Sequence, residues 1–200
     1  MDAKTNTVIG GQYGVSESSV RQLKAFLEPL AARGLNPTSC TVDGNPFAIQ
    51  ALRTLWPDII MQRCLVHVQR QGLMWCRRYP KTIYARKLRD IFLKVAYIRT
   101  KDEKDKLLRL IYQWEERYAH LFESQLGRGK VFSDVKRARS MLINALPDMF
   151  HYLDDLNISF STNGLEGYFS RLKSHYRQHR GLRKTKLTKY IDWYLFLSPR

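Results

Sequence analysis

The spacing of apolar and polar positions divides the chain into two kinds of segment. Between Thr7 and Arg63, short β-branched runs alternate with apolar stripes at helical spacing. We expect strands at residues 7–13, 38–43 and 59–63, a helix capped by Ser18 or Ser19 and ending near Arg33, and a second helix at residues 46–56. Gly34 suits the end of the first helix, and Pro46 suits the first turn of the second. Alternating strands and helices predict an α/β fold.

From Cys64 onward the pattern becomes helical throughout a long stretch. The clearest helix is expected at residues 102–124, with an apolar stripe formed by Leu107, Leu110, Ile111, Trp114, Tyr118 and Leu121. Further helices are expected at residues 64–79, 84–97 and 133–150, and a loop at residues 127–129. We interpret the block as an insertion, because a second acidic motif follows it. The predicted organisation is a partial core at residues 1–67, a helical insertion at residues 68–155 and C-terminal core helices at residues 156–200.

Charge and composition favour a folded protein with a polyanionic partner. The 34 lysines and arginines outnumber the 18 acids and give a net charge of +16, which attracts nucleic acid or an anionic membrane surface. A ribosome-associated or simply basic protein is the alternative. Charges interrupt every long apolar run, and the N-terminus lacks the apolar segment of a signal peptide, so we expect a cytoplasmic protein without a membrane partner. Three cysteines without a CxxC pair fit a reducing compartment.

Two carboxylates stand out against this basic background. Asp43 ends a β-branched run, where α/β sheets bind their ligands, although Asp-Gly is also a common turn. Glu166 lies in the first turn of a strongly patterned helix, where Asn163 as N-cap would give it capping-box spacing. Thr162 and Asn163 would then cap the helix and fix the direction of Glu166. Two acids framed by cations suggest a metal site that acts on nucleic-acid phosphates.

Cys64 and His67 place a thiol and an imidazole three residues apart on one expected helix face. As a zinc site the pair is poor, because no second Cys/His pair follows at zinc-finger spacing. A nucleophile–base pair is a nonspecific alternative. A buried thiol beside a hydrogen-bonded histidine is the simpler interpretation.

Residues 171–189 form a basic tract without a single acid, and aromatic residues are interleaved with it. A solvated basic helix is the alternative, but such a run repels itself unless a polyanion offsets the charge. We expect it to contact DNA phosphates, which positions DNA without reading its sequence. The candidate DNA-binding residues are Arg171, Lys173, Arg177, Arg180, Arg183, Lys184 and Lys186.

Three short motifs, taken in order, resemble the Mutator-like transposases and their bacterial insertion-sequence relatives. They are TVDGNP at residues 41–46, QRCLVHV at residues 62–68 and TNGLEG at residues 162–167. In that family the second catalytic Asp ends a strand, a C-x-x-H signature follows, a helical insertion comes next, and a T-N-x-x-E motif supplies the final Glu. The resemblance covers residues 7–197 and identifies the chain as part of a catalytic core.

The resemblance implies a ribonuclease-H-like mixed-sheet core with a large all-helical insertion. It also implies a DDE triad that binds two Mg²⁺ or Mn²⁺ ions, with Asp43 as the second acid and Glu166 as the third. Cys64 and His67 would match the C-x-x-H signature. The implied chemistry is hydrolysis at transposon ends followed by strand transfer into target DNA. Double-stranded DNA is the implied partner, in a nucleoid-associated protein that is a homo-oligomer when full length.

One part of the family pattern has no match. The first catalytic Asp lies in a central strand that precedes the strand expected at residues 7–13, and Asp2 is the only acid before Thr7. We interpret Asp2 as a hairpin-turn residue and expect a core that is incomplete at its N-terminus and inactive alone. The alternatives are a non-catalytic DNA-binding protein derived from a transposase, and a nuclease outside transposition that shares the fold.

Overall fold

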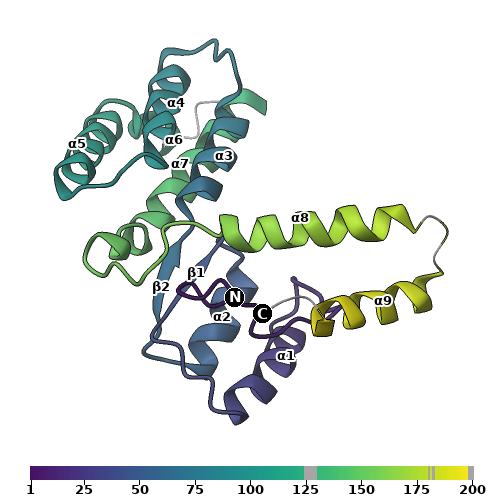
Figure 1. The fold of residues 1–200 in the computed structure, drawn as a ribbon. Helices are drawn as coiled ribbons and strands as arrows, with labels where there is room; N and C mark the ends of the chain where they lie inside the picture. Colours follow the sequence, from purple (N-terminus) through teal and green to yellow (C-terminus); the bar gives the residue numbers. More distant parts are fainter. Residues whose placement is uncertain (124–129, 180, 182, 198–200) are drawn as a thin grey trace. The chain divides into compact units, whose positions relative to one another are not determined.

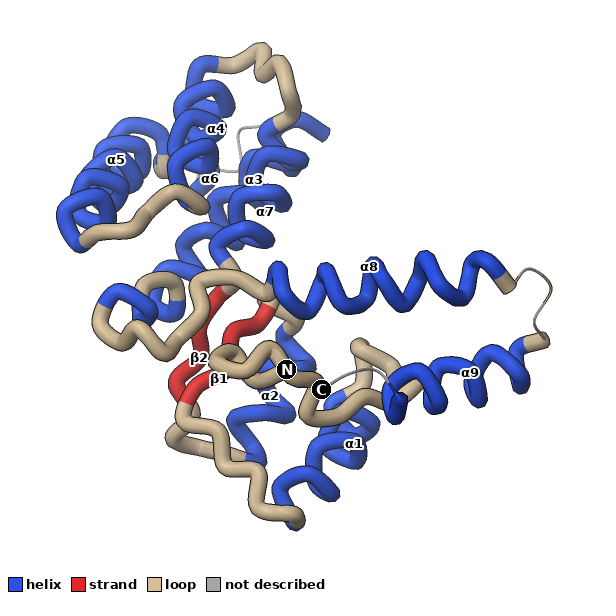
Figure 2. The backbone as a smooth tube through the Cα atoms, viewed as in Figure 1, coloured by secondary structure: helices blue, strands red, loops and turns tan. Residues whose placement is uncertain are grey.

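The computed structural model describes residues 1–123, 130–179, 181 and 183–197. These residues are mostly helical, and their strands form one two-stranded parallel sheet (Figure 1, Figure 2). The chain divides into two compact units: unit 1 comprises Met1–Met61 and Asn157–Arg200, and unit 2 comprises Gln62–Leu156. The predicted domain division stays a prediction, since contacts define compact units and not independent folding.

The α/β pattern predicted after residue 18 is realised closely in unit 1. Helix α1 (Val20–Ala32) begins after Ser19, whose side chain accepts a hydrogen bond from the backbone N–H of Gln22. Strand β1 (Ser39–Val42), helix α2 (Pro46–Leu55) and strand β2 (Ile60–Arg63) follow as a β-α-β crossover. The core of this region consists of Val42, Leu52, Trp56, Ile59 and Met61. Burial of these side chains fixes α2 against the sheet.

The strand predicted at residues 7–13 is wrong. The chain begins with a turn in which the backbone N–H of Asp2 donates to the carbonyl of Thr7 over 2.9 Å, but this turn does not join two strands, so Asp2 lies in a turn and not in the expected hairpin. The following segment is irregular, because no described strand lies beside it to complete a ladder. Glycine instead allows close packing, since a Cβ at Gly10 would lie 3.2 Å from Leu30 and one at Gly11 3.0 Å from Leu195. The predicted mixed sheet is therefore reduced, in the described residues, to β1 and β2.

Unit 2 is helical, as predicted for the insertion. Its elements are α3 (Leu65–Cys76), α4 (Ile83–Val95), α5 (Lys101–Tyr118), α6 (His120–Glu123), α7 (Lys130–Ala145) and the 3-10 turns η1 (Leu146–Asp148) and η2 (His151–Leu153). Helix α3 packs against α4 and α7, and α4 also packs against α5. The helix predicted at residues 102–124 is divided near Ala119. The loop predicted at residues 127–129 lies outside the described residues.

A buried glutamine joins the two ends of unit 2. The Nε2 of Gln62 donates to the carbonyl of Met149 over 2.8 Å, and its Oε1 accepts from the backbone N–H of Tyr152. The hydroxyl of Tyr152 in turn donates to the carbonyl of Ile98 over 2.9 Å. These bonds satisfy polar groups that burial would otherwise leave costly.

Unit 1 ends with two helices, α8 (Asn163–Gln178) and α9 (Lys184–Leu197), which follow one another as a hairpin (Figure 1). Aromatic rings join them, with centroid distances of 5.9 Å between Tyr168 and Tyr194 and 5.2 Å between His179 and Tyr190. Within the described part of the chain, no helix has the length and apolar character needed to cross a membrane.

Candidate functional site

Asp43 is the first residue after β1 and is exposed to solvent. Its Oδ1 accepts a hydrogen bond from the backbone N–H of Asn45 over 3.0 Å, and the intervening Gly44 has a φ of +105°, which favours glycine. Within the described residues, Oδ2 makes no hydrogen bond. Asp43 is therefore both a turn residue and a carboxylate with one oxygen open to a ligand.

Asn45 holds this turn in place from the other side. Its Oδ1 accepts from the backbone N–H of Phe47 over 2.9 Å and caps α2, while its Nδ2 donates to the carbonyl of Glu17 over 2.8 Å. The turn that carries Asp43 is thus fixed to α2 and to the segment before α1. A carboxylate on such a turn has a well-defined direction.

A long-range hydrogen bond connects β1 with the segment that leads into α8. The hydroxyl of Thr41 donates to the carbonyl of Ser159 over 2.6 Å, across 118 positions of sequence. The hydroxyl of Ser159 donates to the carbonyl of Ser161 over 2.8 Å and so closes a local turn. Thr41 shortly precedes Asp43, and this turn shortly precedes α8. The end of β1 and the approach to α8 therefore adjoin within unit 1 (Figure 1).

Glu166 lies in the first turn of α8 and is half-buried. The capping box predicted with Asn163 as N-cap is wrong, because the helix begins at Asn163 and Thr162 occupies the N-cap without a side-chain capping bond. The backbone N–H of Glu166 donates to the carbonyl of Thr162 over 3.0 Å, which places Glu166 one position too far along for a capping box. Glu166 still lies at the N-terminal end of the helix, where the helix dipole is positive.

The two carboxylates have suitable donor chemistry for a divalent cation. Carboxylate oxygens are the ligands that Mg²⁺ and Mn²⁺ prefer, and both Asp43 and Glu166 belong to unit 1. Among the described residues, however, no group of three or more His, Cys, Asp or Glu side chains is arranged to hold a metal ion. The residues present thus fit part of a metal site, and their role as metal ligands stays a prediction.

The C-x-x-H pair lies in unit 2. Cys64 is fully buried at the N-cap of α3, directly after β2, and His67 is half-buried in the first turn of that helix. All three cysteines are free thiols. Burial raises the pKa of Cys76 to about 12 and also raises the pKa of Cys40, so neither is an effective nucleophile near neutral pH.

The predicted DNA-binding residues lie mainly on exposed surface. Within α8 the side chains of Arg171, Lys173 and Arg177 are exposed, and those of Arg183 and Lys186 are exposed near the start of α9. Lys184 begins α9, but its side chain is not described, and Arg180 lies outside the described residues. No ion pair within the described part of the chain engages Arg171, Lys173 or Arg177.

Two contacts of the site region had no signal in the sequence. The bond between Thr41 and Ser159 joins residues too far apart for any local pattern to indicate it. The ring contact between His175 and Tyr194, with centroids 5.6 Å apart, uses one residue of the basic tract, His175, to join α8 to α9. Some of the interleaved aromatic residues therefore serve the packing of this hairpin.

Comparison with known proteins gives one informative match. A family described as "Transposase, Mutator family" matches residues 4–133, which contain Asp43, Cys64 and His67 and end before Glu166. No curated protein and no solved structure gave a significant match. The matched span covers more than half of the chain and includes two of the three motifs singled out above. The chain therefore belongs to the Mutator family of transposases.

Proposed function

We propose that Asp43 and Glu166 are two carboxylates of a DDE-type site at which this transposase cuts and rejoins DNA. The observation that carries the proposal is the hydrogen bond between Thr41 and Ser159, because it links the strand that ends at Asp43 to the segment that leads to Glu166. By analogy, family membership and the β-α-β crossover of unit 1 support a ribonuclease-H-like core for this site.

The chain's own residues would hold the metal and place the DNA. Asp43 would bind through its open Oδ2 while Asn45 holds the turn, and Glu166 would bind from the first turn of α8. When bound, two Mg²⁺ or Mn²⁺ ions would activate the oxygen that attacks the DNA phosphate and stabilise the oxygen that leaves it. The exposed cations of α8 would hold double-stranded DNA by its phosphates.

The proposal assigns two of the three carboxylates that a DDE site uses. The sequence motifs match no third acid, so we infer that the 200-residue chain alone does not cleave transposon ends. Strong Mg²⁺-dependent cleavage of such ends by this polypeptide would contradict that inference. In that case, the cleavage activity of the 200-residue chain would itself be measured in Asp43 and Glu166 variants to test the assignment of these two residues.

The direct test measures metal binding and DNA binding on the same variants. Asp43→Asn and Glu166→Gln remove one charge each with little change of shape, and Asp58→Asn is a matched control because Asp58 is an exposed acid that lies before β2. Calorimetric titration with Mn²⁺ should show weaker binding in the first two variants by roughly tenfold or more, since each loses a charged ligand. The control should bind Mn²⁺ like the unmodified chain.

DNA affinity separates a lost ligand from a damaged fold. Duplex DNA should bind Asp43→Asn and Glu166→Gln as tightly as before or more tightly, because removing a negative charge relieves repulsion of phosphates. Unchanged Mn²⁺ binding in Asp43→Asn would show that Asp43 is not a ligand. Loss of both Mn²⁺ binding and DNA binding would indicate misfolding, which circular dichroism spectra of the variants would reveal.

A non-catalytic DNA-binding protein is the second candidate function. The exposed cations of α8 favour it, because they lack ion-pair partners among the described residues and provide a phosphate-binding surface without any metal. If this alternative is correct, DNA binds equally well with and without Mn²⁺. Asp43→Asn then changes neither the affinity for Mn²⁺ nor the affinity for DNA. The same titrations therefore distinguish the two functions.

A further inference from the structure

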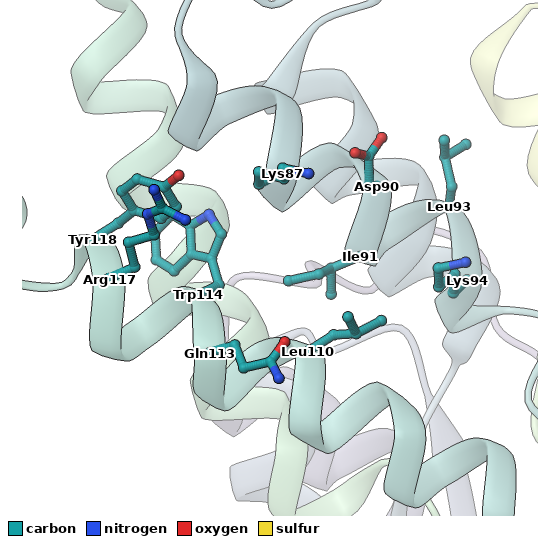
Figure 3. Close-up of a pocket in the computed structure, with 10 residues that line it drawn as sticks. All are labelled: Lys87, Asp90, Ile91, Leu93, Lys94, Leu110, Gln113, Trp114, Arg117 and Tyr118. Carbon is teal, nitrogen blue, oxygen red and sulfur yellow. The ribbon is translucent and has the colours of Figure 1, made fainter.

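A groove with a volume of about 560 Å³ lies between α4 and α5, wholly within unit 2 (Figure 3). Its α4 side is formed by Lys87, Asp90, Ile91 and Lys94, which recur at helical spacing on one face. The α5 side is apolar where Leu110 and Trp114 meet Ile91 across the groove (Figure 3). The groove thus combines an apolar floor with charged rims.

The floor of the groove is rigid. Trp114 is only 4% exposed, and its Nε1 donates to the carbonyl of Tyr84 over 2.9 Å. Its ring also packs on Tyr118 and Phe122, with centroids 5.6 and 5.7 Å away. Because the Trp114 ring is nearly buried, contacts two other rings and has its N–H bonded, it supports the floor and is not free to stack on a nucleobase. Leu110, at 37% exposed, presents apolar surface to an occupant.

The rims carry positive charge that the described residues leave uncompensated. Lys87, Lys94 and Arg117 are exposed around the groove, and none of them forms an ion pair within the described part of the chain. Arg117 instead lies over the ring of Tyr118, with 5.8 Å from Cζ to the centroid. The single acid of the lining, Asp90, does not balance three cations.

Several cations elsewhere in unit 2 have an acidic partner, which Lys87, Lys94 and Arg117 lack among the described residues. Arg77 binds Asp134 over 3.2 Å, and Lys106 binds Asp102 over 2.6 Å. The guanidinium of Arg139 holds both oxygens of Glu115, with 2.9 Å from Nε to each. The lining of the groove brings three unpaired cations and a single acid together with the exposed side chains of Leu93 and Leu110, a combination that favours an anionic occupant with an apolar face.

We propose that this groove docks an acidic amphipathic helix of a partner protein. The rise from Lys87 to Lys94 along α4 is about 10 Å, which matches roughly two turns of a docked helix. Apolar residues at helical spacing on the partner would cover the exposed side chains of Leu93 and Leu110, and acids on both flanks would meet Lys94 and Arg117. A DNA backbone would leave the apolar floor unused. The inference goes beyond the DNA chemistry proposed above and does not depend on it.

The test uses a panel of three fluorescent peptides on the full 200-residue chain. The first is a helical peptide with leucines at positions i, i+3 and i+7 and glutamates on both flanks. The second replaces the glutamates with lysines, and the third scrambles the sequence so that the apolar stripe is lost. Fluorescence anisotropy should show the first peptide binding at least about tenfold more tightly than either of the others. Equal binding of all three, or none, overturns the proposal.

Charge-reversal variants locate the binding site. The double variant Lys94→Glu/Arg117→Glu should weaken binding of the acidic peptide by about tenfold or more, because attraction becomes repulsion. Arg86→Glu/Arg109→Glu is the matched control, since these exposed cations lie on the same two helices outside the groove. Leu110→Gln tests the apolar floor separately and should also weaken binding. If the groove variants bind the peptide as the control does, the site lies elsewhere and the proposal fails.

Duplex DNA is the competing occupant and is measured on the same proteins. Equal DNA affinity of the groove double variant and its control supports a protein partner. A selectively larger loss of DNA affinity in Lys94→Glu/Arg117→Glu would make the groove a nucleic-acid surface and overturn the proposal. Circular dichroism of each variant confirms that the helices are intact.

Discussion

Gly72 of α3 lies directly against the ring of Phe92 on α4. A Cβ at Gly72 would overlap the Cδ1 and Cε1 atoms of that ring. The residue is helical and fully packed, so the reason for glycine is the close approach of another side chain and not an unusual backbone conformation. This contact fixes the distance between two helices that form the centre of unit 2.

Gly72→Ala should therefore destabilise the protein, although alanine is the better helix former. Overpacking against Phe92 is expected to lower the free energy of unfolding by about 1–3 kcal/mol. Gly167→Ala is the matched control, because its new Cβ would meet only the end of Arg171, 3.7 Å away. Helix propensity alone should then stabilise α8 by up to about 1 kcal/mol. Urea unfolding curves measure both, and equal stability of the two variants would contradict the packing argument.

Thr41→Val should weaken the link between β1 and the approach to α8. The substitution keeps the shape of the side chain but leaves the carbonyl of Ser159 without its donor, which we expect to cost about 1 kcal/mol of stability. Thr54→Val is the control, since the hydroxyl of Thr54 makes only a local bond to Gln50 on exposed surface. If the proposed metal site is correct, Mn²⁺ affinity should also fall in Thr41→Val and stay unchanged in Thr54→Val.

The hydrogen bonds of Glu103 at the start of α5 should make the stability of the protein sensitive to acid. Its carboxylate accepts from the backbone N–H groups of Arg99 and Thr100, and the bond from Arg99 makes the largest contribution to lowering the pKa of Glu103 below its ordinary value of 4.5. Because the folded pKa is the lower one, the stabilisation is present above pH 4.5 and is lost as the pH falls through the folded pKa.

Acid unfolding of Glu103→Gln checks this direction. The stability of the variant should fall less steeply below pH 4.5 than that of the unmodified chain, because the titrating group has been removed. Asp105→Asn is the control, since Asp105 is exposed on the same helix outside the capping box. If stability falls with pH identically in Glu103→Gln and in the unmodified chain, the capping box does not contribute to the pH dependence of stability.

The proposed role of α8 in DNA binding predicts a change in salt dependence. If Lys173 and Arg177 each contact one phosphate, replacing either by Gln should lower the slope of log affinity against log salt concentration by about one. Arg21→Gln is the control, because Arg21 is an exposed cation of α1 in the same unit. Anisotropy titrations of duplex DNA at several salt concentrations measure the slopes. Equal slopes in all three variants would place the DNA elsewhere.

Local patterns predicted the elements of this fold well where local forces decide them. Ser19 caps α1, Pro46 opens α2, and the stripe around Ile111 marks α5, all within a few residues of expectation. The strand expected at residues 7–13 was wrong because a strand needs a partner, and the segment packs instead through Gly10 and Gly11. Partner availability is a tertiary property, which apolar alternation does not report.

The sequence motifs identified the residues of the candidate site but did not predict how these residues are arranged. Asp43 was found from a strand end followed by Asp-Gly, and its position directly after β1 agrees with that expectation. The capping box at Glu166 was wrong by one position, because spacing alone does not decide whether Thr162 or Asn163 leaves the helical conformation. The groove between α4 and α5 was not predicted, since it depends on which faces of two helices the packing leaves open.

The interruption of unit 1 by unit 2 has a consequence for synthesis on the ribosome. Residues 62–156 emerge before α8 and α9, so every residue of the helical unit is available for packing while unit 1 still lacks its last two helices. Gln62 and its bonds to Met149 and Tyr152 would close the helical unit as soon as residue 152 has emerged. During translation, Asp43 is therefore synthesised well before the segment that carries Glu166, and the two carboxylates can come together only after that segment has emerged.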